Sequence, residues 1–154
     1  MITIKVKGQP RQGAYGSYYK ISPRRGVKVL DGGEGGEEDE DSSIEADKEW
    51  EHLCLAWKKR KKLHKELGIK IPRPSKRVKV QYGRGEDATV YHAVMMEHIQ
   101  GRTLNGNNDH EDEVMRKTSR YFTDSHDGNF IKKKGNIYRI DFGFPPTKSL
   151  KKLK

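Results

Sequence analysis

Three oxygen-bearing side chains in the last third of the chain have the types and spacing for phosphate chemistry. Asp124 is followed five positions later by Asn129, and Asp141 ends a short predicted strand before Phe142 and Gly143. Phosphoryl transfer requires oxygen ligands for Mg²⁺, a carboxylate that orients the attacking hydroxyl, and a cation on the phosphates. A predicted hairpin connects the two motifs and would bring these oxygens to one metal and phosphate site. The tripeptide Asp-Phe-Gly alone is a weak signal, but the two motifs at this separation are a strong one.

The two motifs resemble those of the protein-kinase-like superfamily. Asp124–Asn129 has the form Asp-x-His-x-Gly-Asn, which looks most like minimal atypical kinases of the RIO type and the aminoglycoside phosphotransferases. The resemblance implies that ATP is the phosphoryl donor and that Mg²⁺ or Mn²⁺ is the cofactor. It also implies that Asp124 is the catalytic aspartate and that Asn129 and Asp141 bind the metal.

Two earlier segments extend the resemblance. Gly13–Lys20 is similar to the second half of a kinase glycine-rich loop, in which backbone N–H groups approach phosphates closely. The resemblance assigns cofactor contacts there to Gly13, Gly16 and Ser17. Lys28 resembles the strand lysine that binds the α- and β-phosphates. Without the other motifs we would interpret Lys28 as a surface residue.

A predicted helix supplies the partner that the resemblance implies for Lys28. The segment around Glu49, with the Pro-x-Pro motif after the helix, is similar to the equivalent helix of RIO-type kinases, in which Glu49 would pair with Lys28. Glu45 and Glu51 are rivals on the same helix. We favour Glu49 because apolar residues follow it at four and seven positions, so that it can face inward.

The segment Val94–Leu104 looks like a kinase hinge. In that resemblance Met96 lies at the back of the adenine pocket. The Glu97 carbonyl and the Ile99 amide would meet the adenine edge through backbone groups. Backbone recognition leaves the side chains free to vary, so in isolation this segment would be interpreted as the end of a buried strand.

The elements that must position these residues are predicted from periodicity and turn residues. Alternating apolar residues in the first thirty positions and from Val78 to Met96 predict about five strands. Ser42 or Ser43 is a good N-cap for one long helix that ends at Gly68. The predicted core stripe of that helix consists of Trp50, Leu53, Cys54 and Trp57.

These elements, with the resemblance, predict an α+β, protein-kinase-like fold. Residues 1–99 would form an N-lobe with an antiparallel sheet and one long helix, interrupted by an acidic flexible loop at 31–41. Residues 100–147 would form a strongly reduced C-lobe with a short helix from Glu111 to Tyr121, the catalytic loop and the Asp-Phe-Gly motif. Residues 148–154 are predicted to be a loose basic tail. ATP with Mg²⁺ is expected to bind between the lobes.

Composition limits the class of protein. The 154 residues suffice for one domain or two small lobes, and no apolar run is long enough for a transmembrane span. The first residues lack the apolar region of a secretory signal, and the single Cys54 excludes a disulfide framework, which favours a cytoplasmic protein. The net charge is +10. Between Asp31 and Glu51 eleven acidic residues and one Lys give 1 − 11 = −10, so the remainder carries +20 and favours polyanion partners.

Departures from the kinase pattern keep alternatives open. Phe122 stands where typical kinases have His, His126 replaces a common Lys, and eleven residues follow Gly143, too few for an activation segment. The leading interpretation is an ATP- and Mg²⁺-dependent phosphotransferase acting on a protein Ser/Thr hydroxyl or on a small-molecule acceptor. Its compactness suggests a viral or phage protein of the host cytoplasm. The alternatives are a nucleotide-binding pseudokinase that acts by binding a partner, and a basic nucleic-acid-binding protein that uses Lys58–Lys62 and the tail.

Overall fold

Apolar residues that alternate in some segments and recur with a helical period in others produce a mixed α+β architecture. The computed structural model describes residues 1–6, 11–13, 16–30, 40–83, 85–106, 108–123 and 125–154. Four α-helices and strands of two sheets occur among these residues. The predicted α+β class is confirmed, whereas its kinase-like identity stays a prediction. The chain divides into two compact units, unit 1 with Met1–Trp50 and Pro74–His98, and unit 2 with Glu51–Arg73 and Ile99–Lys154.

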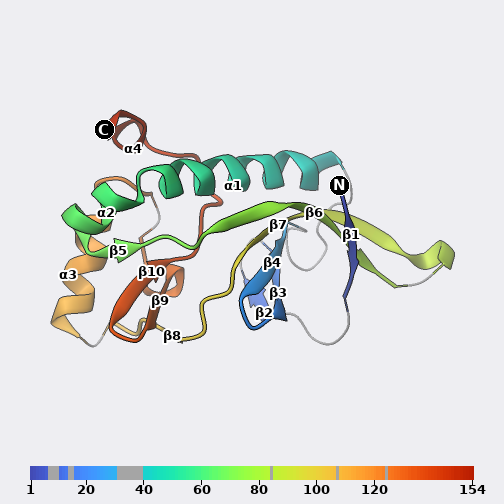
Figure 1. Ribbon diagram of the computed structural model, residues 1–154, viewed down its shortest axis with the longest axis horizontal. Helices are drawn as coiled ribbons and strands as arrows, with labels where there is room; N and C mark the ends of the chain where they lie inside the picture. The colour runs from blue at the N-terminus through green and yellow to red at the C-terminus, as the bar shows by residue number, and fades with distance from the viewer. Residues whose placement is uncertain (7–10, 14–15, 31–39, 84, 107, 124) are drawn as a thin grey trace. The chain divides into compact units, whose positions relative to one another are not determined.

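Unit 1 contains a six-stranded sheet in the order β1-β6-β7-β4-β3-β2 (Figure 1). Most neighbouring strands are antiparallel, as predicted, but β1 runs parallel to β6, so the prediction of a fully antiparallel sheet is wrong at this edge. A parallel pair needs a long connection, and more than sixty residues separate β1 from β6. The strands are β1 Thr3–Lys5, β2 Arg11–Gly13, β3 Gly16–Ser22, β4 Arg25–Val29, β6 Pro74–Tyr82 and β7 Thr89–Glu97.

The two faces of this sheet have different characters. One face carries the apolar core of unit 1, which consists of Tyr19, Val27, Val29, Val78, Val80, Ala93 and Met95. Because side chains alternate along a strand, the residues between these belong to the opposite face. Tyr18 on β3 and Val94 on β7 both lie opposite Lys28 in register, so these three residues share that second face.

The predicted long helix is two helices, α1 Glu40–Lys58 and α2 Arg60–Leu67. The helix begins at Glu40, ahead of the predicted Ser42 or Ser43 cap, and Lys59 interrupts it. The predicted stop is correct, because Gly68 adopts φ 74° and its N–H donates to the His64 carbonyl.

The buried stripe of α1 differs from the predicted stripe. Trp50 and Trp57 are only half-buried, and the guanidinium of Arg60 lies 4.2 Å from the Trp57 ring centroid. Cys54 is half-buried as well, so Leu53 alone of the four predicted residues is fully buried. The fully buried side chains of α1 are Ala46, Glu49, His52, Leu53 and Ala56.

Unit 2 contains α2 and a second sheet with the order β5-β10-β9-β8 (Figure 1). β5 Ile69–Lys70 runs parallel to β10 Asn136–Arg139, which forms an antiparallel hairpin with β9 Phe130–Lys133. β8 Arg102–Thr103 completes the sheet, and α3 Asp109–Thr118 replaces the helix predicted from Glu111 to Tyr121. Two 3₁₀ turns, η1 Gly85–Asp87 and η2 Asp127–Asn129, complete the described elements.

The prediction of a loose C-terminal tail is wrong, because Lys148–Lys152 forms helix α4. The Thr147 hydroxyl accepts a bond from the Leu150 N–H at 3.1 Å and donates to the Tyr121 carbonyl at 2.6 Å. Leu150 is fully buried. Of the predicted acidic loop, residues 31–39 lie outside the described residues. None of the helices in the described ranges is long and apolar enough to cross a membrane.

Candidate functional site

Lys28 and Glu49 form an ion pair within unit 1. Lys28 lies on β4 with its side chain 16% exposed, and Glu49 lies on α1 with its side chain fully buried. A carboxylate without water needs a cation or hydrogen-bond donors, and Lys28 supplies the cation for Glu49. The rivals Glu45 and Glu51 are exposed. The pairing of Lys28 with Glu49, which the resemblance implies, is present, and the chemical role of the pair stays a prediction.

On the sheet face that carries Lys28, the side chain of Tyr18 packs against His98 and lies over Gly26. The Tyr18 hydroxyl lies 2.8 Å from Nδ1 of His98, and the two rings stack with centroids 5.7 Å apart. A Cβ on Gly26 would lie 1.7 Å from the Tyr18 hydroxyl oxygen. Gly26 is therefore needed for Tyr18 to lie across β4 on the face that carries Lys28.

The residues predicted to form the glycine-rich loop divide between the two sheet faces. Gly13 and Gly16 lie opposite each other at the ends of β2 and β3, and residues 14–15 are outside the described residues. Ser17 lies opposite Val29, which belongs to the apolar core face. The side chain of Ser17 therefore does not share the face of Lys28.

The predicted hinge residues lie at and just after the end of β7. Met96 is 3% exposed and lies opposite Gly26, which places it on the face of Lys28. Glu97 lies opposite Arg25, and the next residue, His98, donates its backbone N–H to the Arg24 carbonyl at 2.9 Å. Ile99 is buried and is the first residue of this segment in unit 2.

The two predicted metal ligands lie at the same end of the β9–β10 hairpin in unit 2. Asn129 precedes β9 and Asp141 follows β10, and the Ile140 N–H donates to the Asn129 carbonyl at 2.9 Å. Oδ1 of Asp141 accepts the Gly143 N–H at 2.9 Å, which holds the carboxylate in a tight turn. The predicted catalytic Asp124 lies outside the described residues. Within the described ranges no cluster of three His, Cys, Asp or Glu side chains could hold a metal ion by itself.

Arg139, which sequence reasoning missed, connects the segments that contain the predicted catalytic residues. It is 1% exposed, and its guanidinium donates to the Asp141 carbonyl at 3.1 Å, the Ser125 hydroxyl at 3.3 Å and the Thr123 carbonyl at 2.9 Å. Its Cζ atom lies 4.7 Å from the centroid of the Phe122 ring. The signal in the sequence was alternation, since Arg139 is two positions after buried Ile137 and faces the same way.

His52 on α1 is a second missed residue. It is 1% exposed and its Nδ1–H donates to the Phe142 carbonyl at 3.2 Å. Its ring stacks on Phe122 at 5.5 Å between centroids and meets the edge of Phe142 at 5.3 Å. Burial lowers the pKa of His52, so the neutral imidazole is favoured. The kinase resemblance implies a histidine at the position of Phe122, and here the imidazole of His52 packs on the Phe122 ring.

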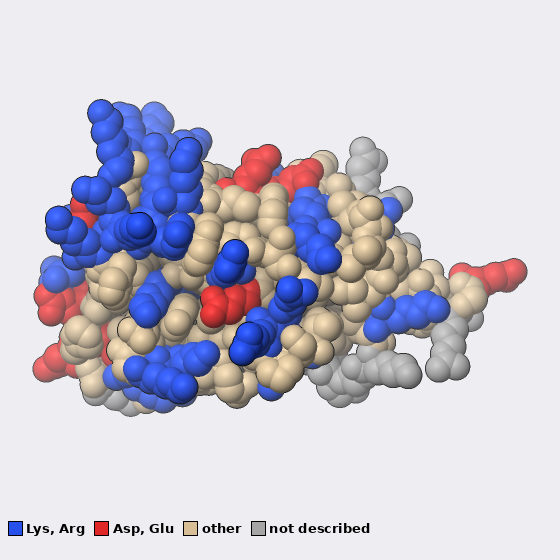
Figure 2. Space-filling view, viewed as in Figure 1, with Lys and Arg blue, Asp and Glu red and all other residues tan. Residues whose placement is uncertain are grey.

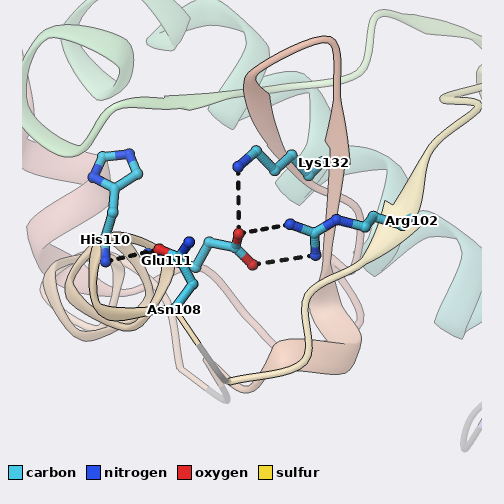
Figure 3. A network of polar contacts seen from close by, with 5 residues as sticks. All are labelled: Arg102, Asn108, His110, Glu111 and Lys132. Atoms are coloured by element: carbon cyan, nitrogen blue, oxygen red, sulfur yellow. Dashed lines mark hydrogen bonds and ion pairs between the residues drawn. The ribbon is translucent and has the colours of Figure 1, made fainter.

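A buried acidic residue of α3 pairs with two cations on the second sheet of unit 2. Glu111 has a fully buried side chain and accepts bonds from Arg102 at 3.3 and 2.7 Å and from Lys132 at 3.3 Å (Figure 3). The hydrogen bond from Arg102 is the main reason that the pKa of Glu111 is lowered. Oδ1 of Asn108 caps the helix by accepting the backbone N–H groups of His110 and Glu111. The network joins α3 to β8 and β9.

Comparisons with known proteins assign no function to this geometry. The chain matches no protein-family model, and no curated protein or solved structure matches it. Function is therefore inferred from the residues of this chain.

Proposed function

We propose that this protein is an ATP- and Mg²⁺-dependent phosphotransferase of the atypical, RIO-like kinase type that transfers phosphate to a protein Ser/Thr hydroxyl. The observation that carries the proposal is the ion pair of Lys28 with buried Glu49, a strand lysine and a helix glutamate. These are the two residues to which the kinase resemblance assigns this contact. The Asn129 and Asp141 side chains at one end of the β9–β10 hairpin add support from unit 2.

The Lys28–Glu49 pair is better suited to positioning a cation than to holding the fold together. Burying an ion pair costs desolvation that its attraction often fails to recover, so apolar residues would stabilise the same contact equally well. Lys28 keeps 16% of its side chain exposed. In the proposed reaction its ammonium binds ATP phosphates, and Glu49 keeps it oriented.

The donor set in unit 2 fits Mg²⁺. Asn129 and Asp141 offer oxygen ligands, and Mg²⁺ is commonly bound by one or two protein oxygens together with phosphate oxygens, without a complete protein cage. When bound, Mg²⁺ neutralises charge on the phosphates. Asn129 and Asp141 hold the metal in this proposal. The adenine binds to the segment that contains Met96, Glu97 and Ile99, through backbone groups.

The Asp124 carboxylate orients the acceptor hydroxyl and takes its proton. The bond from the γ-phosphorus to the ADP oxygen breaks, a bond to the acceptor oxygen forms, and ADP leaves. Arg139 is a positioning residue in this account. Its bonds to Thr123 and Ser125 hold the chain on both sides of Asp124, and its bond to the Asp141 carbonyl connects that chain to the metal-ligand segment.

Incubation with γ-labelled ATP and Mg²⁺, alone and with a protein extract, tests the proposal. We expect label on the protein itself or on an extract protein, and a fall of about 10²–10³-fold for Asp124→Asn. Asp124→Asn should keep the rise in melting temperature that Mg²⁺-ATP causes in the wild type, because its carboxylate meets the acceptor. A melting shift without any transfer would instead identify a nucleotide-binding module. Label on a small molecule alone would overturn the protein acceptor.

A further inference from the structure

Two lysine-rich segments of unit 2 form one strongly basic surface. Neither 58–65 nor 147–154 contains an Asp or Glu residue. Figure 2 shows Lys and Arg side chains gathered over the part of the surface where Figure 1 has α2 and α4. We name this surface the α2–α4 basic patch. Its exposed lysines are Lys58, Lys61, Lys62, Lys65, Lys148, Lys151, Lys152 and Lys154.

Specific contacts hold α4 beside the junction of α1 and α2. Nζ of Lys59 donates to the carbonyls of Leu150 and Lys151, each at 2.6 Å. Leu150 is fully buried, and the Thr147 cap ties the start of the helix to the Tyr121 carbonyl. The lysines of α4 therefore have fixed positions beside those of α2 in unit 2.

Assembling this patch brings like charges together without compensation from nearby acids. Among the described residues, none of the eight patch lysines forms an ion pair with a carboxylate. Glu66 on α2 instead bonds to Tyr121 and lies 4.0 Å from Arg120. Like charges held close repel one another, and binding a polyanion removes this repulsion.

The chemistry of the patch favours nucleic acid over other polyanions. Protein interfaces are depleted in Lys, and this patch is almost all Lys. Membrane-surface helices need exposed apolar side chains, but the large exposed ones in the described residues are Met1, Ile2, Ile21 and Ile44, all in unit 1. Of the aromatic residues described near the patch, Trp57 is half-buried and carries Arg60 over its ring, and Tyr121 is buried. The patch therefore offers charge and no platform for stacking bases.

We propose that the α2–α4 basic patch binds the phosphate backbone of a nucleic acid without reading its base sequence. Lysine ammonium groups bind phosphates as point charges, and each neutralised phosphate releases counterions. This function is separate from phosphotransfer and does not depend on it.

Fluorescence anisotropy with labelled RNA and DNA duplexes, each in two unrelated sequences, over a series of salt concentrations tests this proposal. The patch variant changes Lys61, Lys62, Lys151 and Lys152 to Gln. The matched control makes the same change of net charge in unit 1, at exposed Lys5, Arg24, Arg25 and Lys76. Circular dichroism confirms that both variants are folded.

We expect wild type to bind both sequences equally, with affinity that falls steeply as salt rises. The patch variant should bind at least about tenfold more weakly, with a slope of log K against log salt lower by about three to four, since each phosphate contact contributes ~0.9. The control should stay within about twofold of wild type. Equal losses in the two variants, strong preference for one sequence, or binding to anionic vesicles or polyglutamate but to neither nucleic acid would each overturn the proposal. If RNA and DNA bind unequally, the stronger of the two identifies the ligand.

Discussion

Glu49 and Glu111 are two fully buried carboxylates on helices, each paired with cations from a sheet. Glu49 of α1 meets Lys28 on β4 in unit 1. Glu111 of α3 meets Arg102 on β8 and Lys132 on β9 in unit 2. By burial and charge alone the two would be interpreted alike.

Their partners differ. Arg102 meets Glu111 through two nitrogens and Lys132 adds a third bond, so both carboxylate oxygens are bonded to cations (Figure 3). Arg102 is 52% exposed, and its strand β8 pairs with β9. Lys28 is 16% exposed and shares its sheet face with Tyr18, Gly26 and Met96. The comparison teaches that a buried ion pair becomes a candidate site through the surroundings of its cation.

Replacing Lys28 and Lys132 in turn should give the largest difference in activity between the two ion-pair networks. Lys28→Met should lower phosphate transfer by about 10²–10³-fold, because the cation on the phosphates is lost. Lys132→Met removes the same charge from the Glu111 network and should leave the turnover of folded protein within about threefold. Steady-state kinetics with labelled ATP checks both. Equal losses would mean that Lys28 has only a structural role.

Replacing the two glutamates should separate activity from stability. Glu49→Gln should lower kcat about 10–100-fold and raise KM for ATP, because Lys28 keeps its charge but loses its orienting partner. Exposed Glu45→Gln and Glu51→Gln remove the same charge from the same helix and should stay within about twofold of wild type. A loss at Glu45 or Glu51 with none at Glu49 would show that the pair does not serve catalysis.

Glu111→Gln should act on stability alone. The neutral amide loses the charge-assisted bonds from Arg102 and Lys132, at a cost of about 2 kcal/mol, or about 4–8 °C in melting temperature. Calorimetry measures the loss, and the kinetics of the remaining folded protein should match wild type. Unchanged stability would show that the network is dispensable.

The free energy of unfolding should depend on pH because His52 is buried. Burial lowers its pKa in the folded protein below the ordinary 6.5, so the unfolded chain takes up the proton first as pH falls. The resulting stability is fully present above about pH 6.5 and is lost as pH falls toward the folded pKa, by at most about 1.4 kcal/mol per pH unit.

Glu111 changes stability in the same direction but at lower pH, because its pKa is lowered from 4.5 and its stabilisation is lost below that value. Urea unfolding between pH 7.5 and 5.5 therefore isolates the histidine. His52→Phe should flatten the dependence in this range, while Glu111→Gln should not. A slope that persists in His52→Phe would assign the effect to other groups.

The kinase resemblance implied the Lys28–Glu49 contact, and local periodicity supported the choice of Glu49 on the helix. A motif supplied Lys28, and the helical period placed Glu49 in line with Leu53 and Ala56, both fully buried. Choosing these two residues required one assumption about tertiary structure, namely that the helix packs on the sheet.

The role of Arg139, the helix α4 and the parallel pairing of β1 with β6 depend on tertiary contacts and were missed. Alternation places Arg139 on the side of buried Ile137, but the acceptors at Thr123, Ser125 and Asp141 that allow a guanidinium to be buried there follow from the tertiary fold. The tail looks too basic to fold, but Lys59 and the Leu150 side chain hold it. Short-range patterns contain no signal for acceptors that come from elsewhere in the chain.

The rise in melting temperature caused by Mg²⁺-ATP tests the central claim most directly. A ligand at a hundredfold excess over Kd stabilises the folded state by about 2.7 kcal/mol, which is about 5–10 °C for a chain of this size. We predict this rise for wild type and for Glu111→Gln, the latter from a lower starting temperature, and a rise below about 2 °C for Lys28→Met. No rise in wild type at millimolar Mg²⁺-ATP, or an equal rise in Lys28→Met, would contradict a nucleotide site built on the Lys28–Glu49 pair.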